Sequence, residues 1–406
     1  MSKTSKTGRA KTGREWESPP PVAAEDFVSS LVYTDQTLFD EEMEKVKKAT
    51  WKFACHESEI PEIYDYRCLN HAGIPLIVTR SEDNVIRTFI NACSHRSAMV
   101  LREPSGNAKQ WICLFHRWAF NSKGACIAIP REGAYEESGI CKENRGLREV
   151  RTGVRLGMVF VNLDDDAPEL DDYLGDALEN VEDVMGAKDL EVFHYHQTVL
   201  DVNWKQWHET NMETYHEYLH YVNRNVAMKS KGYGERTWRL YPGGHGTLNP
   251  MQQTYSNIKG WAQRDTAPLP GMQPNEFRTV KIFPDTNILC RATVIRIDTS
   301  TPLGPDKTLV EWRGIGIKGE SEKDRTMRRN HHNQVWGPLG RNLYEDAYAV
   351  ECVEAANRHG AAPYSVIARH EDLKTQDDAM MRSFYAEWSK RMGRPAHNPV
   401  NISDPA

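Results

Sequence analysis

The sequence predicts an α+β protein in which a small antiparallel β domain precedes a larger domain, whose antiparallel sheet is covered by helices. Short strand-like segments crowd residues 50–163, and the acidic, proline-bearing stretch 164–168 then breaks the pattern. Beyond it, segments typical of helices and of strands are mixed. We therefore divide the chain into a partly disordered N-terminal arm (1–40), the small β domain (41–165) and the larger domain (166–406).

The small domain is expected from apolar, β-branched runs separated by turn residues. Polar residues at 81–84 suit a hairpin turn, and residues 121–124 suit a second turn. The strands are expected at residues 74–78, 85–90, 111–115, 118–120, 126–129 and 158–163.

The larger domain combines both kinds of element. Residues 204–222 lack glycine and proline, which favours one continuous helix. Residues 279–317 hold several β-branched runs, which favour a sheet. Residues 325–357 are typical of helix, with an interruption at Gly337 and Pro338.

Composition excludes several classes of function. The 406 residues carry a formal net charge of −6, which argues against a nucleic-acid surface. No apolar run approaches the roughly 20 residues of a membrane span, and the basic N-terminus lacks the apolar segment of a secretory signal. The eight cysteines are therefore expected to be thiols or metal ligands in the cytoplasm, not disulfides.

Two short motifs in the small domain predict a metal centre. Cys93 and His95 are separated by one residue, and Cys113 and His116 by two, so each pair can converge from a tight loop. Two thiolates and two imidazoles suit a Rieske-type [2Fe–2S] cluster or a structural zinc ion. Both pairs lie in strand-connecting loops, whereas a zinc finger pairs a cysteine hairpin with histidines on a helix. The loop context favours the cluster.

These motifs, continued by Arg96 and Trp118, resemble the cluster motif of ring-hydroxylating Rieske oxygenase large subunits. The resemblance covers roughly residues 39–391. The family usually has glycine where this chain has Ser97 and Arg117, and tyrosine where it has Phe115. All four ligand types are kept, while the loop geometry is left in question.

A second constellation lies in the larger domain. His216 and His220 are four residues apart, so on a helix they lie on one face and can bind one metal ion. Two imidazoles and one carboxylate form the facial triad of non-haem Fe(II) oxygenases. His208 lies about two turns before His216 and is an alternative ligand.

The resemblance extends to this segment, where Glu209, Glu213, His216 and His220 match the family pattern. It also implies the third ligand, because residues 337–346 resemble a stretch whose second acidic residue binds iron. That residue is Asp346, and Glu345 is the alternative.

Glu213 lies one turn before His216, where its carboxylate can accept a hydrogen bond from the second imidazole nitrogen. In the family the acid at this position also bridges to the second cluster histidine of the neighbouring subunit, here His116. The resemblance therefore implies a route from cluster to iron between chains, in a trimeric ring of α3 or α3β3 composition.

The resemblance implies a terminal oxygenase that hydroxylates a small organic acid, most often aromatic, with O2 and electrons relayed from NAD(P)H. It implies a [2Fe–2S] cluster, Fe(II), a ferredoxin or flavin reductase, and a small β subunit. An alkanesulfonate monooxygenase of the methanesulfonate type is the alternative within the family. An alternative of another class is a non-catalytic Rieske electron carrier or a zinc-stabilised module, which would leave the larger domain without chemistry.

Overall fold

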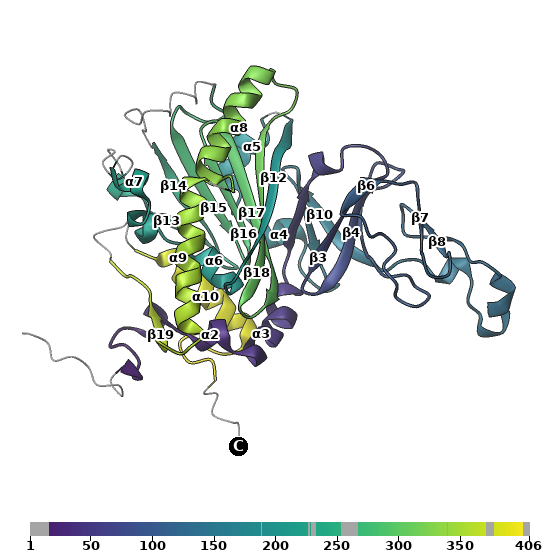
Figure 1. Cartoon of the computed structure of the whole chain (residues 1–406), viewed down its shortest axis with the longest axis horizontal. Coiled ribbons are helices and arrows are strands. Elements are labelled where there is room, and N and C mark those ends of the chain that lie inside the picture. Colours follow the sequence, from purple (N-terminus) through teal and green to yellow (C-terminus); the bar gives the residue numbers. More distant parts are fainter. Residues whose placement is uncertain are drawn as a thin grey trace, which may run out of the picture.

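The computed structural model describes residues 16–187, 189–225, 228, 233–252, 267–338, 340–370 and 377–400. The small β domain projects from one side of a larger domain built around one broad sheet (Figure 1). The basic tail at residues 3–14 lies outside the described residues. Within the described residues, no helix has the length and apolar character needed to cross a membrane.

The small domain contains two antiparallel sheets. The larger has the strand order β2-β11-β10-β5-β4-β3-β6 and the smaller the order β7-β8-β9. The bounds are β2 (Lys52–His56), β3 (Asp65–His71), β4 (Ile74–Arg80), β5 (Ile86–Ile90), β6 (Ser105–Asn107), β7 (Gln110–Ile112), β8 (Ala119–Asn121), β9 (Cys126–Ala128), β10 (Glu149–Arg155) and β11 (Met158–Asn162).

The larger domain is organised by a seven-stranded antiparallel sheet of order β12-β18-β17-β16-β15-β14-β13. Its strands are β12 (Leu190–Leu200), β13 (Trp238–Tyr241), β14 (His245–Gln252), β15 (Glu276–Ile282), β16 (Thr286–Arg291), β17 (Val294–Gly304) and β18 (Lys307–Ile317). Its helices are α4 (Leu170–Leu174), α5 (Glu182–Met185), α6 (Trp204–Glu209), α7 (Tyr221–Asn225), α8 (Glu322–Trp336), α9 (Arg341–Asn357) and α10 (Ala379–Met392).

Alternation along the strands gives the broad sheet two different faces. On β17, Ile295 and Ile297 belong to a core shared with Phe53 and Phe160 of the small domain. Val294, the residue just before Ile295, faces the other way and packs with Trp336 of α8. One face therefore holds the two domains together, and the other is covered by α6, α8 and α9.

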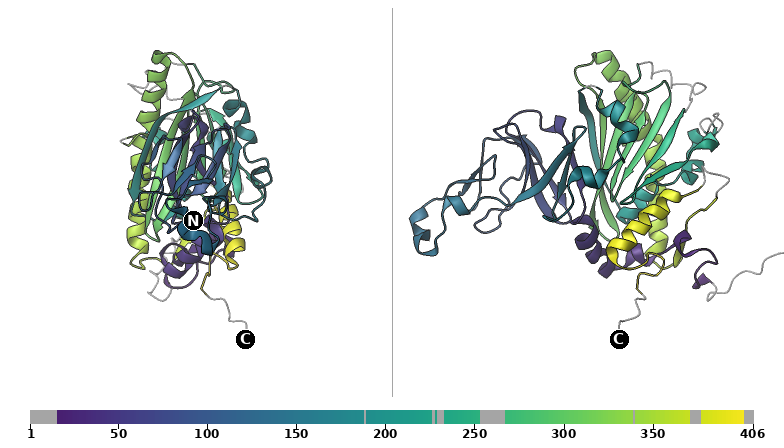
Figure 2. Two further views of the ribbon diagram at one scale, coloured as in Figure 1. Left: turned by 90° about the vertical axis from the view of Figure 1, so that its right-hand side faces the viewer. Right: turned by 180° about the vertical axis from the view of Figure 1, so that it is seen from behind.

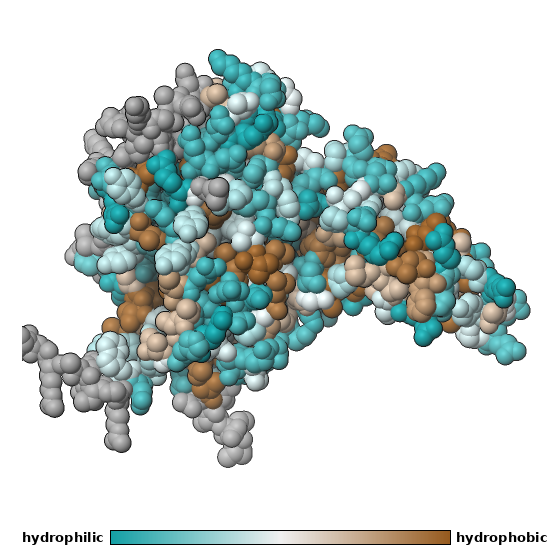
Figure 3. All heavy atoms as spheres, in the orientation of Figure 1, coloured by the Kyte–Doolittle hydropathy of each residue, from teal (hydrophilic) through white to brown (hydrophobic). Residues whose placement is uncertain are grey.

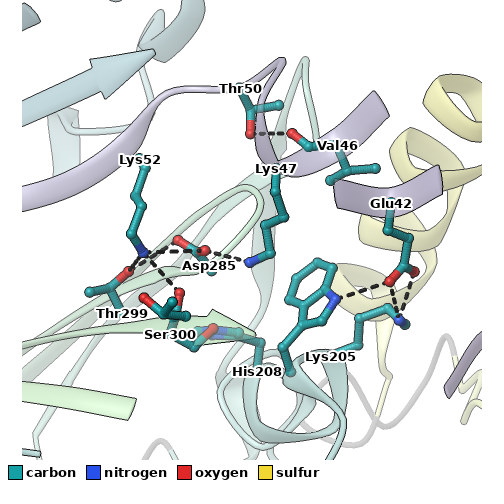
Figure 4. Close-up of polar contacts among 12 residues, drawn as sticks. Glu42, Val46, Lys47, Thr50, Lys52, Lys205, His208, Asp285, Thr299 and Ser300 are labelled. Carbon is teal, nitrogen blue, oxygen red and sulfur yellow. Dashed lines mark hydrogen bonds and ion pairs between the residues drawn. The ribbon is translucent and has the colours of Figure 1, made fainter. Parts of the chain in front are cut away.

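The N-terminal segment packs on the larger domain. It contains β1 (Phe27–Ser29), α2 (Leu31–Thr34) and α3 (Gln36–Glu42), and β1 pairs with β19 (Tyr364–Val366). Viewed from behind, these elements lie beside α10 (Figure 2). Buried Glu42 accepts hydrogen bonds from Lys205 at 2.6 Å and from the indole of Trp204 at 3.1 Å (Figure 4).

The predicted fold class is confirmed: the structure is α+β, with antiparallel sheets in both domains. The expectation of one helix over residues 204–222 is wrong. The chain forms α6, then a 3₁₀ turn at Tyr215–Tyr218, then α7. The Glu213 carboxylate accepts a hydrogen bond from the His216 amide at 2.9 Å, so a side chain caps a new turn where helix was expected.

Candidate metal centres

The two motif loops of the small domain have the same backbone pattern. The Ser97 amide donates to the Cys93 carbonyl at 2.8 Å, and the Arg117 amide donates to the Cys113 carbonyl at 3.0 Å. Each cysteine amide in turn donates to the carbonyl five residues later. The two loops are therefore equivalent tight turns, each presenting one cysteine and one histidine.

The two residues that replace glycine of the family motif fall on the left-handed positions of these turns. Ser97 has φ 59° and Arg117 has φ 64°. Glycine adopts this conformation without steric cost, whereas a side chain costs roughly 1–2 kcal/mol. The loop geometry is thus preserved at these positions, with backbone strain at both.

The side chains of the two motifs meet between the loops. Cys93 and Cys113 are buried, and the rings of His95 and His116 are 4.5 Å apart. The His95 ring is stacked on Trp118 at 4.8 Å. Its Nδ1 is buried and has no hydrogen-bond partner among the described residues. A buried imidazole nitrogen without a partner, on a loop that also presents a buried thiol, fits a metal cluster.

The second nitrogen of His95 contacts a residue that the sequence did not single out. Its Nε2 lies 3.2 Å from the hydroxyl of Tyr135, in the 3₁₀ segment Glu132–Ser138. Phe115, where the family has tyrosine, instead packs on His116 with ring centroids 3.8 Å apart. No sequence signal marks Tyr135, because it lies outside both motifs.

In the larger domain, His216, His220 and Asp346 converge, and their ligand atoms lie within 4.8 Å of one another. Asp346 Oδ1 is 3.2 Å from His220 Nε2 and 3.6 Å from His216 Nε2. His216 comes from the 3₁₀ turn, His220 from the residue before α7, and Asp346 from the first turns of α9. The break in the predicted helix therefore aims both imidazoles at α9.

Two further carboxylates orient the two imidazoles. Glu213 Oε1 is 2.6 Å from His216 Nδ1, and Glu345 Oε2 is 2.7 Å from His220 Nδ1. Each Nδ1 therefore donates, which leaves both Nε2 atoms, close to Asp346, as the nitrogens that can bind a metal. Asp346 Oδ1 is buried without a hydrogen-bond partner in the described part of the chain. These donors fit a divalent cation.

Charge at this site also suits a cation. Burial raises the pKa of Asp346 to about 7. Burial lowers the pKa of His216, but the adjacent Glu213 and Asp346 carboxylates outweigh it and raise this pKa to about 10. Without metal the site therefore holds protons, which a divalent cation would displace.

His208 and Glu209 lie elsewhere. The His208 ring bonds Ser300 Oγ at 2.8 Å and Asn287 at 3.0 Å, inside the buried network of Figure 4. Glu209 accepts hydrogen bonds from the hydroxyls of Tyr33 and Tyr385. The structure does not bring His208 to the His216 site. Glu345 contacts Nδ1 of His220 and is not one of the three side chains that converge.

A pocket of about 540 Å³, including its open mouth, adjoins the three converging side chains. Its wall contains apolar side chains from the sheet and α8, together with two buried arginines, Arg291 and Arg296. Arg296 donates to Asn211 at 2.6 Å and pairs with Asp298 at 2.8 Å. Neither arginine carries a sequence signal, since β16 and β17 bring them to the pocket only in the folded sheet.

Residues 50–151 match the Rieske [2Fe-2S] domain, and residues 187–394 match the ring hydroxylating alpha subunit (catalytic domain). The chain belongs to the ring-hydroxylating oxygenase alpha-subunit family. This ring-hydroxylating alpha subunit is therefore a Rieske mono- or dioxygenase, and its cofactors are a [2Fe–2S] cluster and Fe(II).

The alpha subunit is similar to known proteins along almost its whole length. It is 45% identical to the 2-aminobenzenesulfonate 2,3-dioxygenase subunit alpha of Alcaligenes sp, covering 96% of this chain and 99% of that protein. It is 38% identical to the methanesulfonate monooxygenase hydroxylase subunit alpha of Methylosulfonomonas methylovora, covering 96% and 97%. Its fold matches naphthalene 1,2-dioxygenase from Rhodococcus sp. with a TM-score of 0.77 at 21% identity, covering 90% and 94%.

Proposed function

We propose that this oxygenase acts on a small organic anion, with an aromatic sulfonate as the favoured substrate class. The observation that carries the proposal is the pair of buried arginines, Arg291 and Arg296, in the same pocket as His216, His220 and Asp346. Guanidinium groups form charge-assisted hydrogen bonds with sulfonate or carboxylate oxygens. The relatives named for sulfonates, at 45% and 38% identity, support the sulfonate within this class.

The other pocket walls favour an aromatic substrate over an alkanesulfonate. Five large apolar side chains line them: Trp238, Leu248, Phe277, Leu289 and Trp336. An aromatic ring would remove this surface from water, whereas a single methyl group would cover little of it. The methanesulfonate-type reaction is therefore the second candidate, supported by the 38% relative.

We assign the metals to the side chains that converge. Cys93, His95, Cys113 and His116 would hold the cluster, and His216, His220 and Asp346 would hold the mononuclear iron. When bound, the cluster supplies single electrons and the iron supplies the place where O2 is reduced. Glu213 and Glu345 hold the imidazoles in the ligating tautomer, and the two arginines fix the anion so that its carbon skeleton lies toward the iron ligands.

The electron route is proposed to cross between chains. The loop with Cys113 and His116 connects β7 to β8, which lie toward the outer end of the small domain, away from α7 and α9 (Figure 1). Leu114 and Phe115 are exposed beside the half-buried His116, and an apolar area lies over β7 and β8 (Figure 3). Such a surface suits a protein partner. We propose that His116 meets Glu213 of a neighbouring copy, in a trimeric ring with or without a β subunit, and that a reductase or ferredoxin supplies electrons.

A cytoplasmic location is part of the proposal. All eight cysteines are free thiols in the structure, including three outside the motifs that are buried. Unpaired cysteines in this number suit a reducing compartment.

Oxygen uptake with an NADH-linked reductase tests the substrate class. We would compare 2-aminobenzenesulfonate, 2-aminobenzoate, methanesulfonate and aniline, which lacks the anion. Uptake coupled to product is expected for the aromatic sulfonate, and Arg296→Gln should raise its KM at least about tenfold. Arg296→Lys, which keeps the charge, should recover part of the loss. The proposal fails if aniline is oxidised as efficiently as the sulfonate.

Metal analysis tests the assignment of both centres. The loaded protein should contain about three irons and two sulfides per chain. Two irons with two sulfides would instead indicate an electron carrier, and zinc without sulfide would indicate a zinc-stabilised module.

A further inference from the structure

A second cluster of metal-ligating side chains lies outside the iron site. His194, His196 and His332 each offer a ring nitrogen, and these three atoms lie within 4.8 Å of one another. His194 and His196 are on β12, the edge strand of the broad sheet, and His332 is on α8. None of the three has a role in the cluster, the iron site or the pocket wall described above.

The fold makes room for these imidazoles. Gly314 on β18 pairs with His194, and a β-carbon at Gly314 would lie 2.9 Å from His332 Nδ1. The glycine therefore lets α8 bring His332 down onto the sheet beside β12. The His194 and His332 rings are 4.8 Å apart, and His194 Nε2 is 3.0 Å from His196 Nδ1.

Several ring nitrogens of this cluster are buried without a partner. Neither Nδ1 nor Nε2 of His332 has a hydrogen bond within the described residues, and the same holds for His196 Nε2. Buried polar atoms in native proteins are normally satisfied, so three orphaned nitrogens in one cluster point to a missing ligand.

The positively charged side chains that act on the three histidines are those of Arg296 and Arg329. Arg296 is paired with Asp298 at 2.8 Å. Arg329 is partly exposed and lies 3.9 Å from Glu322. Both arginine charges are thus partly neutralised by carboxylates on their own elements.

We propose that His194, His196 and His332 form a second mononuclear site, for a divalent transition metal of the zinc class. Three imidazoles suit Zn(II), Cu(II) or Ni(II), and carboxylate-preferring Mg(II) or Ca(II) are disfavoured. Three protein ligands leave a fourth position, which water can reach because His194 and His196 are only half-buried on an edge strand. A bound ion would fasten α8 to β12.

The experiment adds Zn(II) to protein whose cluster and iron site are filled, removes unbound metal by gel filtration, and counts zinc, iron and sulfide. About one zinc per chain should remain, with iron and sulfide unchanged. His332→Gln and the half-buried His196→Gln should each lower retained zinc at least about tenfold. His331→Gln is the matched control, since His331 is the adjacent buried histidine of α8 but bonds Thr293.

Anomalous scattering at the zinc edge gives an independent location, with a peak expected between β12 and α8. Three results would overturn the proposal: no zinc retained by the unsubstituted protein, equal retention by His196→Gln, or zinc uptake matched by loss of iron. The last result would show that zinc enters the His216 site instead. Iron and sulfide contents verify that each variant folds.

Discussion

At the scale of single residues, the Glu213 side chain makes two contacts with His216. It caps the 3₁₀ turn through the His216 amide and holds His216 Nδ1 at 2.6 Å. Glu213→Gln keeps the length of the side chain but removes the charge. Iron affinity should fall about 10–100-fold, so the variant is studied with Fe(II) in excess, where both metals stay bound; oxidation of the reduced cluster and turnover should still fall at least about tenfold.

Stopped-flow spectroscopy of the cluster with substrate and O2 measures this effect. Glu345→Gln is the control, because Glu345 holds the other iron-site imidazole and has no part in the proposed route. That variant should bind iron about 10–100-fold more weakly without a specific defect in cluster oxidation. Full activity in Glu213→Gln would discard the bridging role.

His245 gives a prediction on pH and stability. Its Nε2 lies 2.9 Å from the Tyr173 carbonyl, and its Nδ1 accepts from the Phe283 amide at 3.0 Å, so the folded state needs the neutral ring. Burial lowers the pKa of His245 to about 4. Between pH 6.5 and 4 the unfolded state therefore binds a proton that the folded state does not. As the pH is lowered through this range, the free energy of unfolding falls by about 1.4 kcal/mol per pH unit.

Unfolding curves at pH 7 and pH 5 isolate this contribution. Between these two pH values the unsubstituted protein should lose about 2 kcal/mol more than His245→Gln, whose side chain does not titrate. Other buried histidines contribute equally to both proteins and cancel in the comparison. An identical pH dependence of the two proteins would contradict the assignment.

At the scale of elements, the sequence predicts strands better than it predicts the iron segment. The strands at residues 74–78 and 85–90 are apolar runs with a polar turn between them, and local pattern suffices for them. Residues 204–222 have helical composition, yet α6 ends at Glu209, and the Glu213 side chain accepts from the His216 amide at the start of a separate 3₁₀ turn. The four-residue spacing of the histidines still indicated one site, because a 3₁₀ turn followed by α7 also brings them together.

Site residues that belong to no motif were not predictable. Tyr135 reaches His95 from a 3₁₀ segment beyond both cluster motifs. Arg291 and Arg296 reach the pocket from adjacent strands, where alternation of side chains decides which face they occupy. The first contact depends on how a distant segment packs and the other two on strand register, and a single sequence specifies neither.

The cluster loops offer a prediction at the same scale. Ser97 and Arg117 are exposed and have left-handed backbone conformations. Replacing each with glycine relieves strain but adds unfolded-state entropy, so we expect a net gain of up to about 1 kcal/mol per site. Thermal unfolding of the cluster-loaded protein measures it. Ala98→Gly, beside Ser97 but without a positive φ, should be destabilising; a loss in all three variants would refute the strain argument.

At the scale of the whole molecule, a buried ion pair joins the two domains. Glu59, just after β2 in the small domain, accepts from Arg313 of β18 at 2.7 Å, and both side chains are almost fully buried. Glu59→Gln would take the carboxylate away from two guanidinium groups, those of Arg313 and Arg67, and among the described residues the acid left beside Arg313 is Glu311, 3.6 Å away. We expect a loss of about 3 kcal/mol, because removing one partner leaves an uncompensated buried charge.

The same interface contains a matched control at its surface. Arg155 of β10 pairs with Glu182 of α5, again between the two domains, but both side chains are more than 40% exposed. Solvent screens this pair, so Glu182→Gln should cost less than about 1 kcal/mol. Urea unfolding compares the two variants directly. If Glu59→Gln costs no more than Glu182→Gln, the apolar core that includes Phe53 and Phe160 holds the domains together by itself, and the buried pair contributes only to their alignment.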